Sequence, residues 1–546
     1  MGVARAASRK PNRPAIVKWR DGLLILCLAG IIFGAAHGAG ILDPWQANDD
    51  TRQQVFWMQR FSDPSLYPND PLSTYASYYV PQALQLLYRL AAPVAPAILF
   101  SKILTGVLFV LLSLSFYGLG CAIGGKRLGW CLTATTWLMP AFLYNMSGGI
   151  SRSFAAPLTV LFLWRWAKGD TRGQALALFL QALFIPYAFI TCAAASLLAR
   201  LCARLKRRLE PKPFPAKSAH WLVLALGMFL VWLMNHRFNA AGYGPLASVA
   251  DMRGHPEFSA MGRLELYPQP GIFMDALYYP FERIGVFLEW GLIPGIASLA
   301  VLAGYLFWEG RRVPWRELLS KARPAVWLTA AGGILYIAAR VMLLRLFVPD
   351  RYLTIPLTIL YALGIAAVAA SSVKRLKKPL TVALLAVCIV LSFLRLHGQG
   401  LFDYSAHASC YEAVRALPAD VTLAGPPRLM DDIMTFGQRK ALVTYKLAHV
   451  WSLGWWRWYE PRLRALFSAY YADDPGQVRD FCRSFGVNYL VVDENDFSPQ
   501  AIADHPFFAP FDAFIQSLTK GRTHFALLDF PYTRIGKTIR LIRMTN

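Results

Sequence analysis

The chain has 546 residues, of which 56% are hydrophobic and only 16% are charged. About a quarter of the residues of an ordinary soluble domain are charged, so this composition argues against a series of soluble domains and excludes disordered, collagen-like and disulfide-dense secreted proteins. Lys and Arg number 56 against 32 Asp and Glu, which gives a net charge of +24. Such an excess is typical of nucleic-acid-binding proteins, but here the basic residues separate long apolar segments.

Apolar segments of the length that a helix needs to cross a membrane begin at Gly22 and recur until Phe393. We therefore predict an α-helical polytopic membrane protein with about eleven transmembrane helices. The predicted spans are 22–41, 103–123, 128–146, 154–167, 174–186, 187–203, 217–235, 285–307, 325–345, 352–371 and 379–395. The first of them is interpreted as an uncleaved helix, because no small-residue cleavage site follows it.

The charge distribution predicts how these helices are oriented. The stretch 174–203 is too long for one ordinary crossing, contains Pro186 and is flanked by basic residues at both ends. By the positive-inside rule both ends are cytoplasmic, so we expect two short helices that turn outside around 184–187. The N-terminus is then inside and the C-terminus outside. Basic loops that face the anionic lipids of the inner leaflet account for the net charge without nucleic acid as a partner.

A soluble region follows the last predicted span. Its short apolar strands alternate with amphipathic stretches, which is typical of a small α/β domain. We expect strands at 421–424, 489–492 and 525–528 and helices at 410–417 and 476–485. The predicted domains are a transmembrane domain, 1–396, with a long first outer loop, 42–96, and a periplasmic α/β domain, 397–546. Its two cysteines, Cys410 and Cys482, either form a disulfide or stay as buried free thiols, and the sequence favours neither alternative.

The first outer loop is rich in carboxylates. Five aspartates lie between Asp43 and Asp70, directly after the first predicted span. Carboxylates in this position can act as a general base on an acceptor hydroxyl or hold a divalent cation. The alternative is that Asp-Pro and Asn-Asp pairs are turn and helix-cap residues. Spacing alone slightly favours this structural explanation.

An acidic pair shortly after the first transmembrane helix, in a long outer loop that continues with aromatic stretches, resembles the GT-C superfamily of membrane glycosyltransferases. The odd number of crossings, the short paired helices and the outer C-terminal domain agree with this resemblance. The segment Pro349-Asp350-Arg351-Tyr352 is similar to the Pro-x-Arg-Tyr element on the outer face of many such proteins. A Trp-Trp-Asp triplet is absent, and its nearest counterpart is Trp455-Trp456-Arg457. The resemblance therefore disfavours an oligosaccharyltransferase.

The resemblance implies transfer of a sugar from a polyprenyl-phosphate-linked donor to an acceptor at the outer face. The family's acidic pair falls on Asp49 and Asp50, with Asp50 as the main candidate for the catalytic base. Both are also the candidate ligands if the enzyme uses Mg²⁺ or Mn²⁺. Helix capping remains the alternative role of Asp49.

Such a donor requires fixed cations at the level of the lipid headgroups, and Arg offers a bidentate fork for phosphate. The candidates are Arg351, Arg152 and Arg340, with snorkelling as the alternative for cations at helix ends. Ionisable residues in spans are often functional, and the loop after the seventh span is long enough to cover a cleft. Further candidates for the substrate cleft are Asp70, His255, Glu257, Glu289 and Lys102.

The sequence thus predicts a membrane glycosyltransferase of a bacterial inner membrane, with a glycan, lipid or protein as acceptor and membrane lipids around it. A multi-pass transporter or flippase is the main alternative. Against it, transporters usually consist of two related halves with sites at the membrane midplane, whereas no repeat is visible here and the ionisable residues gather at the outer edge. A non-catalytic scaffold with the same fold is the second alternative.

Overall fold

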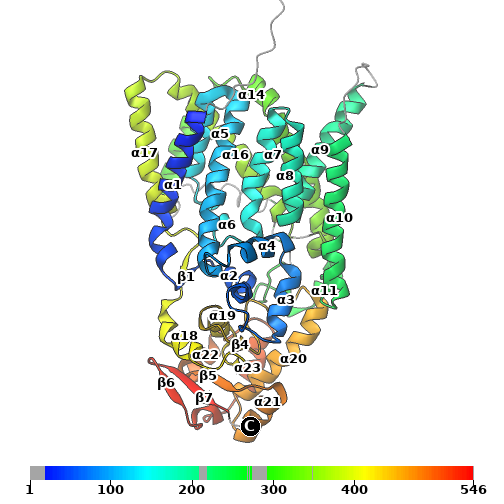
Figure 1. Ribbon diagram of the computed structural model, residues 1–546, viewed down its shortest axis with the longest axis vertical. Helices are drawn as coiled ribbons and strands as arrows, with labels where there is room; N and C mark the ends of the chain where they lie inside the picture. The colour runs from blue at the N-terminus through cyan, green and yellow to red at the C-terminus, as the bar shows by residue number, and fades with distance from the viewer. Residues whose placement is uncertain are drawn as a thin grey trace, which may run out of the picture.

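The computed structural model describes residues 19–207, 218–266, 269, 271–272, 292–346 and 348–544. A bundle of long helices forms one end of an elongated molecule, and a smaller domain with a β-sheet forms the other (Figure 1). Helix lies within every predicted span. The bundle helices are α1 (Trp19–Leu42), α5 (Ala97–Trp137), α6 (Pro140–Met146), α7 (Ala155–Ala167), α8 (Thr171–Phe184), α9 (Pro186–Arg207), α10 (Ser218–Ala240), α13 (Leu292–Gly310), α15 (Arg323–Met342), α16 (Asp350–Val373) and α17 (Lys378–Leu396). The predicted polytopic helical fold is confirmed.

Seven of the described helices are long and apolar enough to cross a membrane: α1, α5, α9, α10, α15, α16 and α17. The 41-residue α5 covers two predicted spans, because the chain reverses at Gly125, whose φ of 81° favours glycine. The two halves pack against each other, with the rings of Tyr117 and Trp130 5.5 Å apart. The shorter α7 and α8 pack against each other, and α7 also packs against α5. The expected break between the paired helices lies at Ile185, between α8 and α9.

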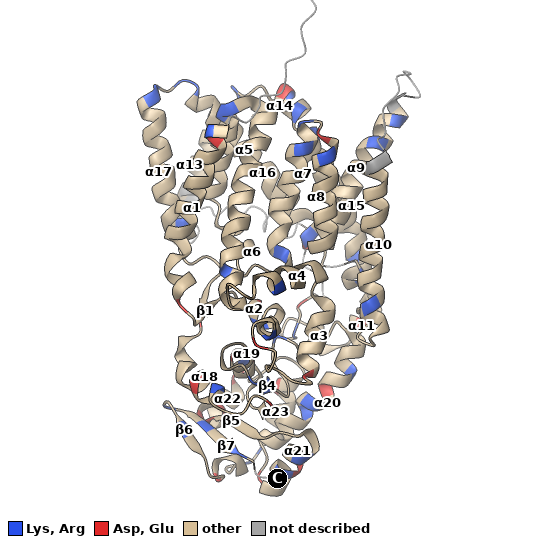
Figure 2. Cartoon of the chain, in the orientation of Figure 1, with Lys and Arg blue, Asp and Glu red and all other residues tan. Residues whose placement is uncertain are grey.

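Basic side chains gather at the end of the bundle that lies away from the sheet domain, around α14 (Trp315–Lys321) and the nearby ends of α9 and α17 (Figure 2). Several of them pair with acidic neighbours at this end. Lys126 lies 2.7 Å from Asp21, and Arg312 lies 2.6 Å from Glu309. An excess of Lys and Arg at one end of the bundle is the pattern that the positive-inside rule describes for the cytoplasmic side.

The first outer loop is folded rather than extended. It contains β1 (Gln46–Ala47), α2 (Thr51–Gln54), the 3₁₀ turn η1 (Phe56–Phe61), α3 (Pro71–Tyr79) and α4 (Gln82–Ala91). Its aromatic residues Phe56, Trp57 and Tyr67 are buried, so they form a core for the loop itself. Strand β1 pairs antiparallel with β2 (Phe402–Asp403), which follows α17. This pairing joins the loop to the start of the outer domain.

The outer domain is built on a five-stranded sheet in the order β4-β3-β5-β7-β6. Its strands are β3 (Thr422–Ala424), β4 (Lys440–Ala441), β5 (Tyr489–Asp493), β6 (Thr533–Ile535) and β7 (Ile539–Arg543). Strands β4, β3 and β5 are parallel, whereas β7 runs antiparallel to β5 and β6. The surrounding helices are α18 (Ala408–Arg415), α19 (Pro427–Asp432), α20 (Leu453–Tyr470), α21 (Pro475–Phe485), α22 (Pro499–Ala503) and α23 (Phe511–Thr519).

Some expectations for this region are corrected or resolved by the structure. The predicted strand at 525–528 is wrong, because the chain forms the 3₁₀ turn η10 (Ala526–Leu528) there and Phe525 packs its ring on Phe497 instead of entering the sheet. Cys410 and Cys482 are both buried free thiols. Glu289 and the first part of the predicted span 285–307 lie outside the described residues.

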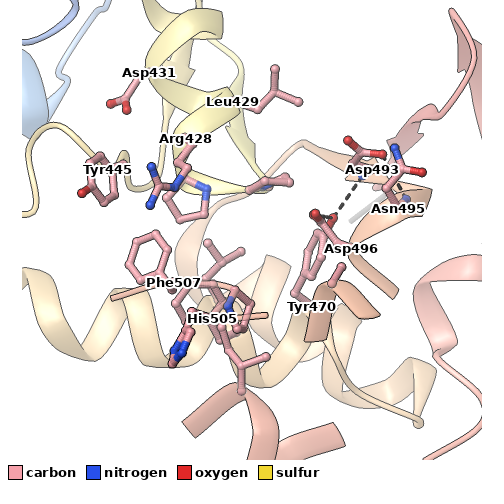
Figure 3. A pocket seen from close by; sticks show the side chains of 18 of the residues that line it. Arg428, Leu429, Asp431, Tyr445, Tyr470, Asp493, Asn495, Asp496, His505 and Phe507 are labelled. Atoms are coloured by element: carbon pink, nitrogen blue, oxygen red, sulfur yellow. Dashed lines mark hydrogen bonds between the residues drawn. The ribbon is translucent and has the colours of Figure 1, made fainter. Parts of the chain in front are cut away.

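A cavity of about 830 Å³ lies where the parallel strands β3 and β5 end (Figure 3). Gly425, directly after β3, and Asp493, the last residue of β5, both line it. The carboxyl ends of parallel strands are where open α/β sheets bind their ligands. We call this space the outer cavity. It extends to Asp49 of the first outer loop.

Candidate active site

The acidic pair lies at the start of α2, between the bundle and the outer domain. The backbone carbonyl of Asn48 accepts the N–H of Thr51, and the carbonyl of Asp50 accepts the N–H of Gln54. The side chain of Asp50 makes no capping hydrogen bond. Its carboxylate is therefore not used for holding the helix, as the structural explanation of the aspartates would require.

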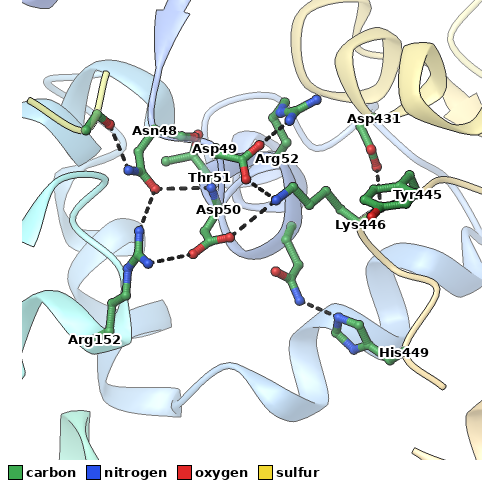
Figure 4. Close-up of polar contacts among 12 residues, drawn as sticks. Asn48, Asp49, Asp50, Thr51, Arg52, Arg152, Asp431, Tyr445, Lys446 and His449 are labelled. Carbon is green, nitrogen blue, oxygen red and sulfur yellow. Dashed lines mark hydrogen bonds and ion pairs between the residues drawn. The ribbon is translucent and has the colours of Figure 1, made fainter. Parts of the chain in front are cut away.

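Cationic side chains from three parts of the chain surround the pair (Figure 4). Arg152 Nη1 lies 3.1 Å from Asp50 Oδ2, and Lys446 Nζ lies 3.5 Å from Asp50 Oδ1. Lys446 also contacts Asp49, which in turn pairs with Arg52. The Lys446 ammonium thus lies between the two carboxylates and connects them to the outer domain.

A second acidic pair, at the end of α19, continues this network into the outer cavity. Arg52 Nη1 donates to Asp432 Oδ1 over 2.7 Å, and the backbone N–H of Lys446 donates to Asp431 Oδ1 over 2.9 Å. The guanidinium of Arg52 also lies over the ring of Tyr404, 4.4 Å from its centre. Arg52 therefore joins the first loop to the second acidic pair.

The surroundings of these carboxyl groups shift their pKa values in opposite directions. Burial raises the pKa of Asp49, but the charges and hydrogen bonds of Lys446 and Arg52 outweigh this effect, so the pKa lies below its ordinary value. Burial raises the pKa of Asp431 to about 7, against weaker opposing effects. Burial also raises the pKa of Asp432. At neutral pH the network therefore contains one firmly ionised carboxylate and one carboxyl that is close to its titration point.

Asn48 fixes the relative positions of the pair and of Arg152. Its Nδ2 donates to the carbonyl of Gly400 over 2.8 Å, while its Oδ1 accepts Arg152 Nη2 over 3.1 Å. Gly148 packs against it in a left-handed conformation with φ of 96°, and a Cβ there would lie only 2.8 Å from the Cβ of Asn48. Glycine at position 148 thus allows the segment ahead of Arg152 to approach Asn48 closely.

Arg152 and Arg351 line a second, smaller cavity on the membrane side, which we call the inner cavity. It lies among α6, α7, α9 and α16 and holds about 30 Å³, with Asn145, Tyr187 and Thr354 also in its wall. The buried Nε of Arg152 has no hydrogen-bond partner among the residues that the structure describes. The two arginines come from sequence positions about two hundred residues apart, yet they face one space.

Three of the other predicted site residues line neither cavity and have structural contacts instead. Arg340 donates to the hydroxyl of Tyr336 on its own helix over 3.0 Å. Lys102 is buried and donates to the carbonyl of Gly40 over 2.7 Å, at the end of α1. Asp70 caps α3, where its carboxylate accepts backbone N–H groups of the first turn. This geometry does not support a substrate-binding role for these three residues.

The loop after α10 packs on the outer domain. Arg263 Nε donates to the carbonyl of Tyr445 over 3.2 Å, next to Lys446, and the N–H of Ala509 donates to the carbonyl of Met261 over 2.8 Å. His255 is exposed, and its Nδ1 lies 4.0 Å from Glu257. Neither His255 nor Glu257 lines the outer or the inner cavity. The loop covers the outer domain through its arginine rather than through these two predicted residues.

Asp49 and Asp50 do not fit a divalent cation in this arrangement. Oxygen-rich sites for Mg²⁺ or Mn²⁺ need several uncommitted ligands, whereas Arg52, Lys446 and Arg152 already contact the two carboxylates. Across the part of the chain that the structure describes, no three His, Cys, Asp or Glu side chains come together as a possible metal site. The Lys446 ammonium lies where a cation between the carboxylates would lie.

Sequence reasoning missed Lys446, Asn48 and Asp431 as site residues. Lys446 lies 397 residues from Asp49 in the sequence, and no local pattern marks it. The adjacent Asp431 and Asp432 repeat the motif of the first loop and were the available signal. Such pairs are informative only when the topology that brings them together is known.

No protein-family model and no curated protein sequence matches the chain. Several solved structures are similar to it. ArnT from Cupriavidus metallidurans bound to undecaprenyl phosphate has a TM-score of 0.50 at 11% identity, with 97% of this chain and 99% of that chain covered. The apo state of the same protein has a TM-score of 0.49 at 12% identity, with the same coverage. An oligosaccharyltransferase from Archaeoglobus fulgidus in complex with Zn and sulfate has a TM-score of 0.46 at 15% identity, covering 91% of this chain and 70% of that chain. The similarity to ArnT shows that the two chains share a fold, and the polytopic helical fold that the resemblance implied is confirmed.

Proposed function

We propose that this protein is a membrane glycosyltransferase that transfers a sugar from a polyprenyl-phosphate-linked donor to an acceptor at the outer face of the membrane. The observation that carries the proposal is the position of Asp50. Its carboxylate contacts Arg152, which lines the inner cavity, and Lys446, which lines the outer cavity. The fold of a protein whose structure contains undecaprenyl phosphate supports the donor class.

The inner cavity is the proposed site of the donor phosphate. Arg152 and Arg351 supply the positive charge, and the unpartnered Nε of Arg152 is a donor that a phosphate oxygen would satisfy. With about 30 Å³, the cavity holds little more than one water-sized group. Phosphate binding therefore requires a side chain to move, and Arg351, with 31% of its side chain exposed, is placed to do so.

The proposed reaction is a direct displacement that inverts the anomeric configuration. The acceptor hydroxyl oxygen attacks the anomeric carbon, and the bond from this carbon to the phosphate oxygen breaks. The electron pair of the broken bond stays on the lipid phosphate, where the arginines stabilise the charge. The proton of the acceptor hydroxyl passes to the carboxylate of Asp50, which acts as the general base. Asp49 and Lys446 position this carboxylate, as their contacts indicate.

No metal ion takes part in the proposed reaction, because the cationic side chains around Asp49 and Asp50 already balance their charge. Mg²⁺ or Mn²⁺ would have to displace Lys446 to bind between the carboxylates. We further propose that the basic end of the bundle faces the cytoplasm of a bacterium and that the outer domain is periplasmic. The proposed acceptor is a glycan, a lipid or a protein.

The test is donor consumption by the full chain in nanodiscs, with a panel of polyprenyl-phosphate-linked sugars as donors and with glycan, lipid and protein acceptors present. We expect Asp50→Asn and Arg351→Ala to lose consumption while both variants stay folded. The matched control is Asp63→Asn, because Asp63 is an exposed aspartate of the same loop whose carboxylate bonds only to Ser65. Wild-type consumption by Asp50→Asn would remove this residue from the mechanism. Absence of consumption with every donor would favour a transporter or a non-catalytic scaffold.

A further inference from the structure

The outer cavity is much larger than the proposed chemistry requires. Its volume of about 830 Å³ lies within the range of sites that bind small molecules. The cavity begins at Asp49 and Lys446 and continues to Asp493 and Asp496 beyond the end of β5. Figure 3 shows Arg428, Asp431 and Tyr445 on one side of this space and Asp493, Asn495 and Asp496 on the other. Only its beginning takes part in the reaction proposed above.

Asp431 is the strongest sign that a ligand belongs in this space. It lines the cavity, yet only 1% of the residue is exposed. One carboxyl oxygen accepts the backbone N–H of Lys446, whereas Oδ2 has no hydrogen-bond partner among the described residues. A buried carboxyl oxygen without a partner destabilises the folded protein, because it has lost its hydrogen bonds to water without gaining others. A ligand with a hydroxyl group would supply the missing hydrogen bond.

The charges of the outer cavity indicate what kind of ligand this is. Six aspartates line it against three basic side chains, Arg52, Arg428 and Lys446. Arg52 and Lys446 are engaged by carboxylates of the two acidic pairs. At the far end, Asp493, Asp496 and Asp504 form no ion pair with any Lys or Arg in the part of the chain that the structure describes. An anionic ligand is therefore opposed there, whereas hydroxyl groups can donate to these carboxylates.

Aromatic side chains supply the apolar part of the wall. Tyr470, Tyr471 and Phe507 also line the cavity. Tyr470 also donates its hydroxyl to Asp496 Oδ2 over 2.9 Å, so this carboxylate is held beside an aromatic ring. Rings next to fixed carboxylates match a ligand that combines apolar C–H faces with hydroxyl groups, which is the chemistry of a sugar.

We infer that the outer cavity binds the acceptor and that the acceptor is an uncharged glycan whose terminal hydroxyl reaches Asp49 and Asp50. This assignment of the acceptor rests on the proposed transferase function. The site offers no free strand edge to which an extended peptide could add as a further strand. The cavity opens at the ends of β3 and β5, and both are interior strands of the sheet.

The test measures sugar binding, which needs no donor. The full chain in nanodiscs is titrated by calorimetry with short neutral oligosaccharides and, separately, with an uncharged peptide of similar length. We expect an oligosaccharide to bind and Asp504→Asn to weaken it roughly tenfold, the effect of losing one hydrogen bond to a charged group. Asp504 is exposed, and its side chain makes no hydrogen bond or ion pair within the described part of the chain. Asp496→Asn is the second variant, because Asp496 lines the same end of the cavity and accepts the hydroxyl of Tyr470. Asp480→Asn is the control, because Asp480 lies on exposed α21 outside the cavity.

Three outcomes would overturn the inference. No neutral oligosaccharide binds, or only the peptide binds, or Asp504→Asn and Asp496→Asn bind the oligosaccharide as tightly as the control Asp480→Asn does. Donor consumption by the wild type, measured in parallel with glycan, lipid and protein acceptors present, separates this result from the proposed function. If sugars bind as expected but no donor is consumed, the cavity is a carbohydrate site and the transferase proposal fails. If donor is consumed but no neutral sugar binds, the transferase proposal stands and the acceptor is of another class.

Discussion

Lys446 of the outer domain and Asp49 of the first outer loop form an ion pair across 397 residues of sequence. The same ammonium lies 3.5 Å from Asp50, so one side chain contacts both members of the acidic pair. Arg52 makes the reciprocal connection, from the loop to Asp432 of the outer domain. The outer domain therefore contributes side chains to the candidate site.

Replacement of Lys446 tests this dependence. Lys446→Met removes the positive charge between the carboxylates, and we expect donor consumption, as kcat/KM, to fall about 10- to 100-fold, the effect of losing a charge-assisted hydrogen bond. Lys446→Arg keeps the charge and should recover part of the activity. Lys520→Met, a change of an exposed lysine in the same domain, is the control. Unchanged kcat/KM in Lys446→Met would show that the ammonium does not position Asp50.

Chelation tests the role of a divalent cation. Because Lys446, Arg52 and Arg152 already contact Asp49 and Asp50, we expect donor consumption to be the same in excess EDTA as in Mg²⁺ or Mn²⁺. The measurement is the initial rate of the wild type under the three conditions. Loss of activity in EDTA that returns with either ion would mean that a metal displaces Lys446 during turnover.

Much of the fold could be predicted from the sequence, because membrane helices carry a local signal. Hydropathy predicted the position of a helix within every span. The basic residues at both ends of 174–203 predicted the division of this stretch into α8 and α9. Sheet elements carry a weaker signal. The apolar run at 525–528 has the composition of a strand, but Phe525 packs against Phe497 and the chain turns, so β6 and β7 form later.

The site could be predicted only in part. Asp49, Asp50 and Arg152 stand in short patterns that suggest chemistry. The structure places Arg152 in contact with Asp50 and connects Asp50 to Asp49 through Lys446. Lys446 stands in no such pattern, since its position depends on how the outer domain packs on the loop. For Lys102 and Asp70 the sequence does not separate a role in the cleft from a structural role. A buried lysine can bond to the carbonyls at a helix end and a buried aspartate can cap a helix, and the sequence looks the same in either case.

The close contact of Gly148 with Asn48 provides a test of the geometry around Arg152. Gly148→Ala places a methyl group 2.8 Å from the Cβ of Asn48 in a backbone conformation that disfavours alanine. Gly169→Ala is the matched control, because Gly169 also has a positive φ but open space around it. We expect Gly169→Ala to lose about 1 kcal/mol of unfolding free energy from backbone strain and Gly148→Ala to lose more because of the contact with Asn48, while only Gly148→Ala loses donor consumption. Equal activity of the two variants would show that Arg152 does not depend on this packing.

The raised pKa of Asp431 predicts how stability depends on pH. The native carboxyl keeps its proton up to about pH 7, whereas in the unfolded chain it loses the proton near its ordinary pKa of about 4. Between these two values the native state binds more protons than the unfolded state, so this residue lowers the free energy of unfolding as the pH rises. Asp431→Asn removes the ionisation and keeps an oxygen that can accept the N–H of Lys446.

We therefore expect Asp431→Asn to unfold at a higher temperature than the wild type at pH 8 and at nearly the same temperature at pH 4, where the carboxyl is protonated in the native state and partly protonated in the unfolded chain. Thermal unfolding of the two proteins in detergent at both pH values measures this. Asp496 has the same kind of shift, with a pKa that burial raises to about 6, so Asp496→Asn should show the effect at a slightly lower pH. The same Asp431→Asn variant should bind neutral oligosaccharides less well, since it alters the unpartnered oxygen. A gain in stability together with a loss of binding is expected of a residue kept for its ligand, and a parallel loss of both would instead make Asp431 a structural residue.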